Sequence, residues 1–167
     1  KRDWSSDVCS SDLTTMAKKL ELNDILDLRA YERDRKATVA RMITIKQARR
    51  VTVGGFVTLV FENRDTVWFQ IHEMARVEKL IRDEQIAEEL KAYNPLIPEP
   101  GELSATLFLE LTSDAQMREW LPKLVGIEKA VRVRLGEGPD AVLVPFRPDQ
   151  VHADQLTREE KIGRAHV

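Results

Sequence analysis

The first part of the chain is dominated by apolar residues at helical spacing. Asn23 is a favourable N-cap, and the pattern after it predicts a helix that opens with Asp24 and runs to about Arg49. Arg35 interrupts the apolar stripe of this helix. We expect its stem to lie along apolar neighbours while its guanidinium reaches water.

Two more helices are predicted before a proline-rich loop. Asp65 can cap a helix over residues 66–81, although the stretch from Thr66 to Gln70 is β-prone and could return as a hairpin strand. The helix is preferred because the pattern beyond Gln70 stays helical and no glycine supplies a tight turn. A further helix is expected around residues 83–93.

Alternating apolar and polar positions predict three short strands, at residues 51–53, 56–61 and 103–111. Ser113 and Gln116 form a capping box that opens another helix, which Pro122 kinks. Residues 131–146 alternate on both sides of a turn and form the clearest hairpin. The expected fold class is α+β: a single domain over residues 14–160, with a mainly antiparallel sheet of short strands packed with about four or five helices.

The two ends are predicted to be foreign to the protein. Residues 7–12 and 161–167 can be read as translations of opposite strands of one short DNA, which looks like a sequencing-library adapter. Residues 1–13 and 161–167 are therefore interpreted as non-native tails, with Met16 as the expected start. The capping box Thr157–Glu160 opens a helix just where the second tail begins, so the domain is expected to be truncated at its C-terminal end.

Setting these tails aside changes the composition. Of 26 basic and 28 acidic side chains, 22 and 25 remain, and the one cysteine, Cys9, is lost. A chain without cysteine holds no disulfide, no Cys-type zinc site and no thiolate-bound iron–sulfur cluster. No apolar run is long enough to span a membrane and no signal sequence follows Met16, so a cytoplasmic protein is expected.

Motifs for catalysis and metal binding are incomplete. His72-Glu73 resembles the start of a His-Glu-x-x-His zinc motif, but Arg76 stands where the second histidine is required. Gly54-Gly55 lacks the other residues of a phosphate-binding loop and is interpreted as a turn. We therefore expect neither a metal nor a cofactor, and a non-enzymatic role is favoured.

The most site-like segment follows the strand at residues 56–61. Polar side chains gather there between apolar runs and form a candidate ligand or interaction site: Glu62, Asn63, Arg64, Gln70, His72, Glu73 and Arg76. In such a cluster an arginine could hold an anionic group while a carboxylate or His72 moves protons. The competing interpretation, a buried salt-bridge network that fixes the strand-to-helix junction, is preferred.

A second candidate surface is basic. The first predicted helix and the residues after it carry a candidate basic face: Arg33, Lys36, Arg41, Lys46, Arg49 and Arg50. This face could meet phosphates, lie in solvent, or dock the acidic stretch 83–102 of the same chain. Nucleic-acid binding is disfavoured, because the domain is slightly acidic and no aromatic residues interleave the arginines.

Several short motifs resemble one bacterial family. They are Phe61-Glu62-Asn63-Arg64, Phe69-Gln70-Ile71, Glu73-Met74, Tyr93-Asn94-Pro95, the run Pro-Gly-Glu-Leu-Ser-Ala-Thr-Leu at 100–107, and Trp120-Leu121-Pro122-Lys123-Leu124. Over residues 20–160 the chain resembles domain of unknown function 3501, and the run at 100–107 is specific to that family. The resemblance implies no catalytic residue, because the family has no established activity. It does imply a gene neighbourhood of rubrerythrin-like and iron–sulfur, heterodisulfide-reductase-like proteins.

Three functional hypotheses follow. The first is a non-enzymatic accessory or assembly partner of a redox or iron–sulfur protein. The second is an enzyme or small-ligand binder, which requires the side chains of the Glu62–Arg76 cluster to converge on an open pocket. Nucleic-acid binding through the first helix is the third.

Overall fold

The computed structural model describes residues 18–146, which divide into two compact units. The described part of unit 1 comprises residues 18–51 and 59–106, and that of unit 2 comprises residues 52–58 and 107–146. The predicted tails and the Thr157–Glu160 capping box lie outside the described residues. Helices and short antiparallel strands make up both units, so the predicted α+β class is confirmed.

Helix α1 (Leu28–Ala48) begins later than the sequence predicts. Its N-cap is Asp27, whose side chain accepts a hydrogen bond from the Ala30 amide at 2.9 Å. The predicted N-cap, Asn23, lies inside the 3-10 turn η1 (Leu22–Asp24), where the Asp24 carboxylate accepts the Glu21 amide. This local bond belongs to a separate turn. Helix α1 therefore begins after that turn, at the point where Asp27 provides its N-cap.

Helix α2 (Arg64–Glu78) starts two residues earlier than predicted. Asn63 caps it: the Asn63 side chain accepts from the Thr66 amide, and the Thr66 hydroxyl accepts from the Asn63 amide. The predicted cap at Asp65 is therefore wrong, while the preference for helix over strand at residues 66–70 is confirmed. The helix ends before 81, because Lys79 adopts a left-handed conformation with φ 55°.

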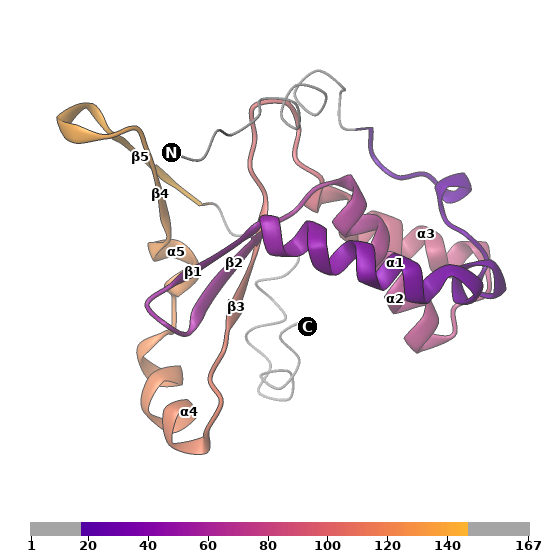
Figure 1. Cartoon of the computed structure of the whole chain (residues 1–167), viewed down its shortest axis with the longest axis horizontal. Helices are drawn as coiled ribbons and strands as arrows, with labels where there is room; N and C mark the ends of the chain where they lie inside the picture. The colour runs from indigo at the N-terminus through magenta and orange to yellow at the C-terminus, as the bar shows by residue number, and fades with distance from the viewer. Residues whose placement is uncertain (1–17, 147–167) are drawn as a thin grey trace. The chain divides into compact units, whose positions relative to one another are not determined.

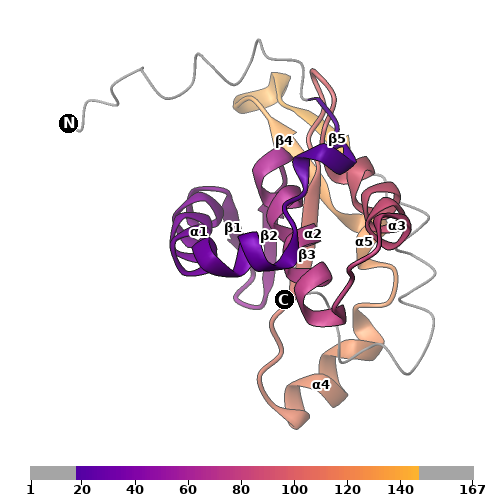
Figure 2. The ribbon, with the colours of Figure 1, turned by 90° about the vertical axis from the view of Figure 1, so that its right-hand side faces the viewer.

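Unit 1 is built on α2. Helix α1 packs on one side of it and α3 (Asp83–Tyr93), followed by the 3-10 turn η2 (Asn94–Leu96), packs on the other, as Figures 1 and 2 show. The apolar core lies between α2, α3 and the segment before α1, and its buried members are Leu20, Val67, Ile71, Ala75, Ile86, Leu90, Tyr93 and Ile97.

A three-stranded sheet contributes residues to both units. Its strands are β1 (Arg50–Val53), β2 (Val57–Phe61) and β3 (Ala105–Leu109), in the order β1-β2-β3. Gly54 and Gly55 join the first two strands with φ values of 64° and 87°, so the predicted turn is confirmed and its glycines are required by backbone conformation.

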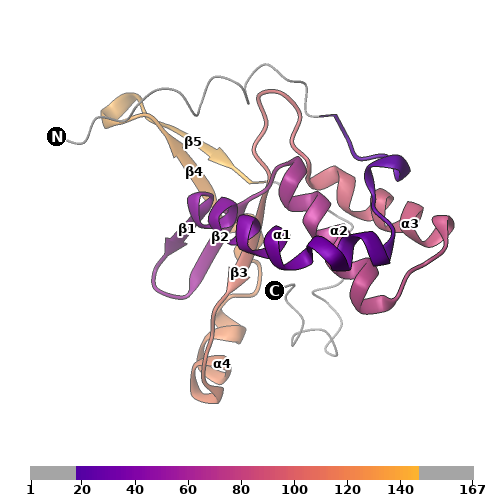
Figure 3. The ribbon, with the colours of Figure 1, turned by 45° about the vertical axis from the view of Figure 1, so that its right-hand side comes forward.

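The rest of unit 2 consists of short elements. They are α4 (Asp114–Trp120), η3 (Leu121–Lys123), α5 (Ile127–Ala130), β4 (Arg132–Leu135), η4 (Gly138–Asp140) and β5 (Val142–Pro145). Ser113 caps α4 as predicted, but the Gln116 side chain accepts from the Thr112 amide and does not complete a capping box with Ser113. Pro122 lies in the 3-10 turn after the helix instead of kinking it. The predicted hairpin is confirmed: β4 and β5 pair antiparallel (Figure 3), and the register places Val133 opposite Val144. None of the helices described in residues 18–146 is both long and apolar enough to cross a membrane.

Candidate functional site

Two of the residues predicted as a site, Arg64 and His72, contact the segment that precedes α1. We call residues 18–27 the strap. It is fastened at one end by Asn94, whose side-chain amide accepts from the Leu20 amide at 2.8 Å and donates to the Leu20 carbonyl at 2.9 Å. The Leu20 side chain is buried in the core, with 3% of its surface exposed. Lys19 adds a bond from its ammonium group to the Ile97 carbonyl.

Arg64 binds the strap at its first residue and near its middle. Its Nε donates to the Lys18 carbonyl at 2.9 Å, and its Nη2 lies 2.8 Å from the Asp24 carboxylate. The pKa of Asp24 is lowered, first by its backbone hydrogen bond within η1 and then by Arg64. Trp68 adds a bond from its indole nitrogen to the Asp24 carbonyl at 2.8 Å. The first turns of α2 therefore bind the strap through side chains that point at its backbone.

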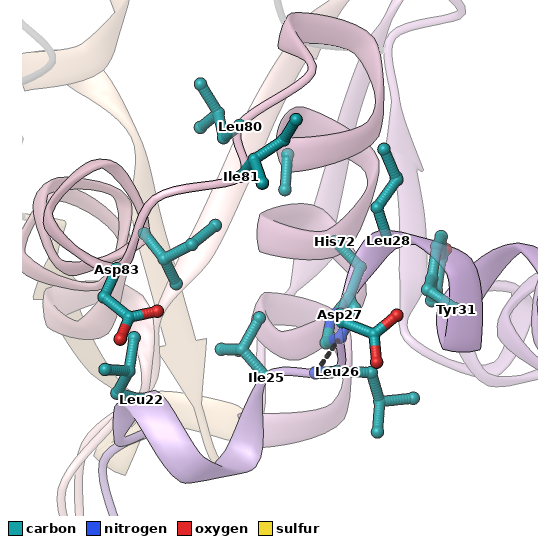
Figure 4. A pocket seen from close by; sticks show the side chains of 12 residues that line it. Leu22, Ile25, Leu26, Asp27, Leu28, Tyr31, His72, Leu80, Ile81 and Asp83 are labelled. Carbon is teal, nitrogen blue, oxygen red and sulfur yellow. Dashed lines mark hydrogen bonds between the residues drawn. The ribbon is translucent and has the colours of Figure 1, made fainter.

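His72 fastens the other end of the strap. Its Nε2 accepts from the Leu26 amide at 3.0 Å (Figure 4). Its Nδ1 lies 2.8 Å from the Trp68 carbonyl, to which it donates. These two partners fix the neutral tautomer with the proton on Nδ1. The ring is 2% exposed, and burial lowers its pKa. Both nitrogens are used by the backbone, so neither is available to a ligand.

Glu73 is the centre of a network that joins α1 to α2. Its carboxylate accepts from the Tyr31 hydroxyl at 2.6 Å, from Arg35 Nε and Nη2 at 2.9 Å each, and from Arg76 Nη2 at 3.3 Å. Burial alone would raise the pKa of Glu73, but the bonds from Arg35 and Tyr31 outweigh it and hold the pKa at about 2. Burial, and then the bond to Glu73, raises the pKa of Tyr31. The carboxylate is thus charged at neutral pH, and both of its oxygens accept hydrogen bonds from neighbouring side chains.

Arg35 is placed differently from the prediction. Instead of extending into water, its guanidinium binds Glu73 in a two-point arrangement, and the side chain is only 35% exposed. A charged residue that interrupts an apolar stripe needs a buried counter-charge when the helix packs through that stripe. That interruption was the signal that Arg35 belongs to the network.

The remaining candidates are also bonded within unit 1. The Glu62 carboxylate accepts from the Thr106 hydroxyl at 2.5 Å and from the hydroxyl of Thr66. Asn63 is the N-cap of α2, and the Gln70 side chain bonds with Tyr93. The structure therefore divides the seven predicted residues among several local bonding groups, and it does not gather them at one opening.

One cavity lies beside the strap. It has a volume of about 180 Å³. Figure 4 shows that most of the side chains around it are aliphatic and that Asp27 and Asp83 also line it. Tyr31 and His72 contribute to its lining, but the carboxylates and arginines of the predicted site do not. Its size is below the ~300–1,000 Å³ of typical small-molecule pockets.

The predicted basic face lies on α1 and at the start of β1. Arg33, Lys36, Arg41 and Arg50 are exposed, whereas Lys46 and Arg49 are half-buried. Because α2 lies between α1 and α3, the basic face does not dock the acidic α3 (Figure 2). Within residues 18–146, no three histidine, cysteine, aspartate or glutamate side chains gather as a metal site would require.

Comparison with known proteins identifies the family. The family profile described as "Protein of unknown function (DUF3501)" matches residues 19–159. The chain belongs to this family. It is also similar to a solved structure described as a novel protein of unknown function from Burkholderia pseudomallei K96243, at 36% identity and a TM-score of 0.67, covering 81% of this chain and 80% of that one. No curated protein matches.

The segments that resemble the DUF3501 family include much of the strap's fastening. Phe61-Glu62-Asn63-Arg64 supplies the helix cap and the strap-binding arginine, and Tyr93-Asn94-Pro95 supplies the asparagine that brackets Leu20. Sequence reasoning missed the parts that Tyr31, Trp68 and Asn94 play. Their partners are backbone groups or a carboxylate more than forty positions away, which no local pattern reveals.

Proposed function

We propose that this member of the DUF3501 family is a non-enzymatic accessory protein that binds a component of a redox or iron–sulfur protein system. One observation carries the proposal. The side chains best suited to chemistry, Glu73 and His72, have their polar atoms bonded to other side chains or to the backbone. Among the buried side-chain polar atoms of the described residues, only Arg76 Nε has no hydrogen-bond partner. A polar cluster bonded to this extent fixes the fold and leaves function to the surface.

An enzyme built on the same residues is less well supported. A general acid or base needs a pKa near the working pH and reach to a substrate. The pKa of Glu73 is about 2, and His72 has no open nitrogen. Neither cavity described in unit 1 is lined by Glu62, Arg64, Glu73 or Arg76. The cluster therefore lacks the opening that the enzyme hypothesis requires.

The nature of the partner rests on the family resemblance. It implies a gene neighbourhood of rubrerythrin-like and iron–sulfur, heterodisulfide-reductase-like proteins, and a small accessory protein is expected to bind the products of neighbouring genes. Nucleic acid is the less favoured partner. At 100° per residue, the basic side chains of α1 spread over most of the helix circumference, whereas a duplex contacts one face.

The test is direct binding to those neighbours. The full chain is titrated by calorimetry against the purified rubrerythrin-like protein and the heterodisulfide-reductase-like protein from adjacent genes. We expect a complex with at least one of them, with a Kd on the order of micromolar or tighter. No heat and no co-elution with either protein at about 100 μM, roughly a hundred times that Kd, would overturn the proposal.

A parallel titration with duplex DNA addresses the third hypothesis. Phosphate binding predicts an affinity that falls steeply as salt rises, whereas protein binding through an apolar surface predicts a weak dependence. Tight, strongly salt-dependent DNA binding without any protein complex would replace the accessory role by a nucleic-acid role.

A further inference from the structure

A groove runs along the exposed flank of α1. Its walls come from the helix positions Val39, Ile43, Lys46 and Gln47, from Arg50 just beyond, and from Phe69 of α2; Met42 lies at its base, and its volume is about 250 Å³. These positions are spaced by three or four residues, so they form one continuous stripe. The groove lies wholly within unit 1.

Apart from Met42, the apolar residues of this stripe are not buried in the core. Only Tyr31 and Met42 are buried along the 21 residues of α1, and Ile43 has 54% of its surface exposed. An amphipathic helix normally turns its aliphatic residues toward the protein. Here Ile43 and Val39 line an open groove next to Phe69. Exposed apolar residues arranged in this way are typical of a surface that binds the apolar surface of another molecule.

The charge of the groove indicates the kind of partner. Two of the residues that line the groove, Lys46 and Arg50, are basic, and none is a carboxylate. Lys46 crosses the groove with its ammonium group 5.2 Å from the centre of the Phe69 ring. The positive charge favours an acidic segment, and Lys46 can exchange its contact with Phe69 for a carboxylate of that segment.

We propose that this groove binds an acidic amphipathic segment of a partner protein, with apolar side chains at helical spacing seated over Val39, Ile43 and Phe69. This assignment rests on the proposed accessory function and identifies the surface through which the protein would bind its partner. The groove is smaller than a typical small-molecule pocket, but a row of side chains from a helix can fill an open groove of this kind. The apolar floor distinguishes it from a phosphate-binding surface.

The experiment is a selection with a peptide library. Random peptides of about 16 residues, four to five helical turns, are displayed on phage and selected on the full chain. Enriched peptides are then titrated against the wild type and two groove variants, Ile43→Gln and Lys46→Gln. Two matched variants, Val77→Gln and Lys91→Gln, change an exposed aliphatic and an exposed lysine on α2 and α3 away from the groove.

The expected peptides are net negative, with apolar residues three or four positions apart. Ile43→Gln should weaken their binding about tenfold, since one buried aliphatic contact is lost. Lys46→Gln should weaken it severalfold and reduce its salt dependence. The two control variants should bind like the wild type. No enrichment, basic peptides, or peptides unaffected by both groove variants would overturn the assignment.

The two proposals fail separately. If the full chain binds a neighbouring gene product and both groove variants bind it equally well, the groove is not the surface, although the accessory function stands. If the library yields groove-dependent acidic peptides but no neighbouring gene product binds, the groove assignment stands and the redox partner is wrong. Circular dichroism of each variant excludes loss of folding as the cause of weakened binding.

Discussion

The strap and the β4–β5 hairpin are held in different ways. The strap buries Leu20 and is bonded by side chains from α2 and from the residues after α3. The two hairpin strands pair through backbone bonds, and every described side chain of residues 107–146 is at least partly exposed. An antiparallel ribbon of two strands is marginal without apolar burial. The difference indicates that stability is concentrated around α2, so substitutions there should have much larger effects.

The largest effect is expected at the centre of the unit 1 core. Ile71 has no exposed surface, so Ile71→Ala should lower the free energy of unfolding by about 3–4 kcal/mol through lost burial and the cavity left behind. Urea denaturation followed by circular dichroism measures the change. A loss below about 1 kcal/mol, no more than an average point substitution causes, would show that the core is not concentrated there.

A slightly smaller effect is expected at Glu73. Glu73→Gln should cost about 3 kcal/mol near pH 7, because Arg35 and Arg76 lose their shared counter-charge. The pKa of Glu73 is lowered from 4.5 to about 2, so its contribution is complete above pH 4.5 and is lost as the pH falls from 4.5 toward 2. The variant should lack that part of the acid dependence. Glu78→Gln, an exposed carboxylate on the same helix, is the control and should change stability by less than about 0.5 kcal/mol.

Loss of the hydrogen bond between His72 and the strap should have an intermediate effect on the free energy of unfolding. His72→Leu removes the acceptor of the Leu26 amide and should cost about 1–2 kcal/mol at pH 7.5, with faster hydrogen exchange at Leu26. Burial lowers the pKa of His72 below 6.5, so the wild type should lose stability as the pH falls below 6.5, while the variant should not. Equal losses in both proteins between pH 7.5 and 5.5 would contradict this role.

The smallest effect is expected in the hairpin. Leu143 has 64% of its surface exposed, so Leu143→Ser should change the free energy of unfolding by less than about 0.5 kcal/mol. Hydrogen exchange provides a second readout, because the amides of β4 and β5 should exchange faster than those of α2. A large loss of stability would mean that the hairpin is held as firmly as the strap.

Local patterns were sufficient to predict most elements of the fold. The stretch 66–70 was recognised as helical from the residues beyond Gln70, and the hairpin from alternation on both sides of its turn. The starts of two helices were wrong for one shared reason. Asn23 and Asp65 are each a few positions from a competing cap, and hydrogen bonds within the first turn decide between them.

The candidate site was predictable only in part. The preference for a salt-bridge network at the strand-to-helix junction came from the density of charges around Glu62 and Glu73. The partners of Glu73 on α1 lie 42 and 38 positions earlier in the sequence, and only tertiary packing brings Tyr31 and Arg35 to it. The strap was missed because its attachment uses backbone atoms, which every residue possesses.

That mode of attachment determines which changes the N-terminal segment can tolerate. Asn94 and His72 contact peptide groups of Leu20 and Leu26, so they are indifferent to most side chains that those peptide groups might carry. An imino acid is the exception, since proline at position 20 or 26 has no amide hydrogen to donate. Most replacements at the exposed Leu26 can keep the bond, whereas replacements at position 20 also remove the buried Leu20 side chain from the core.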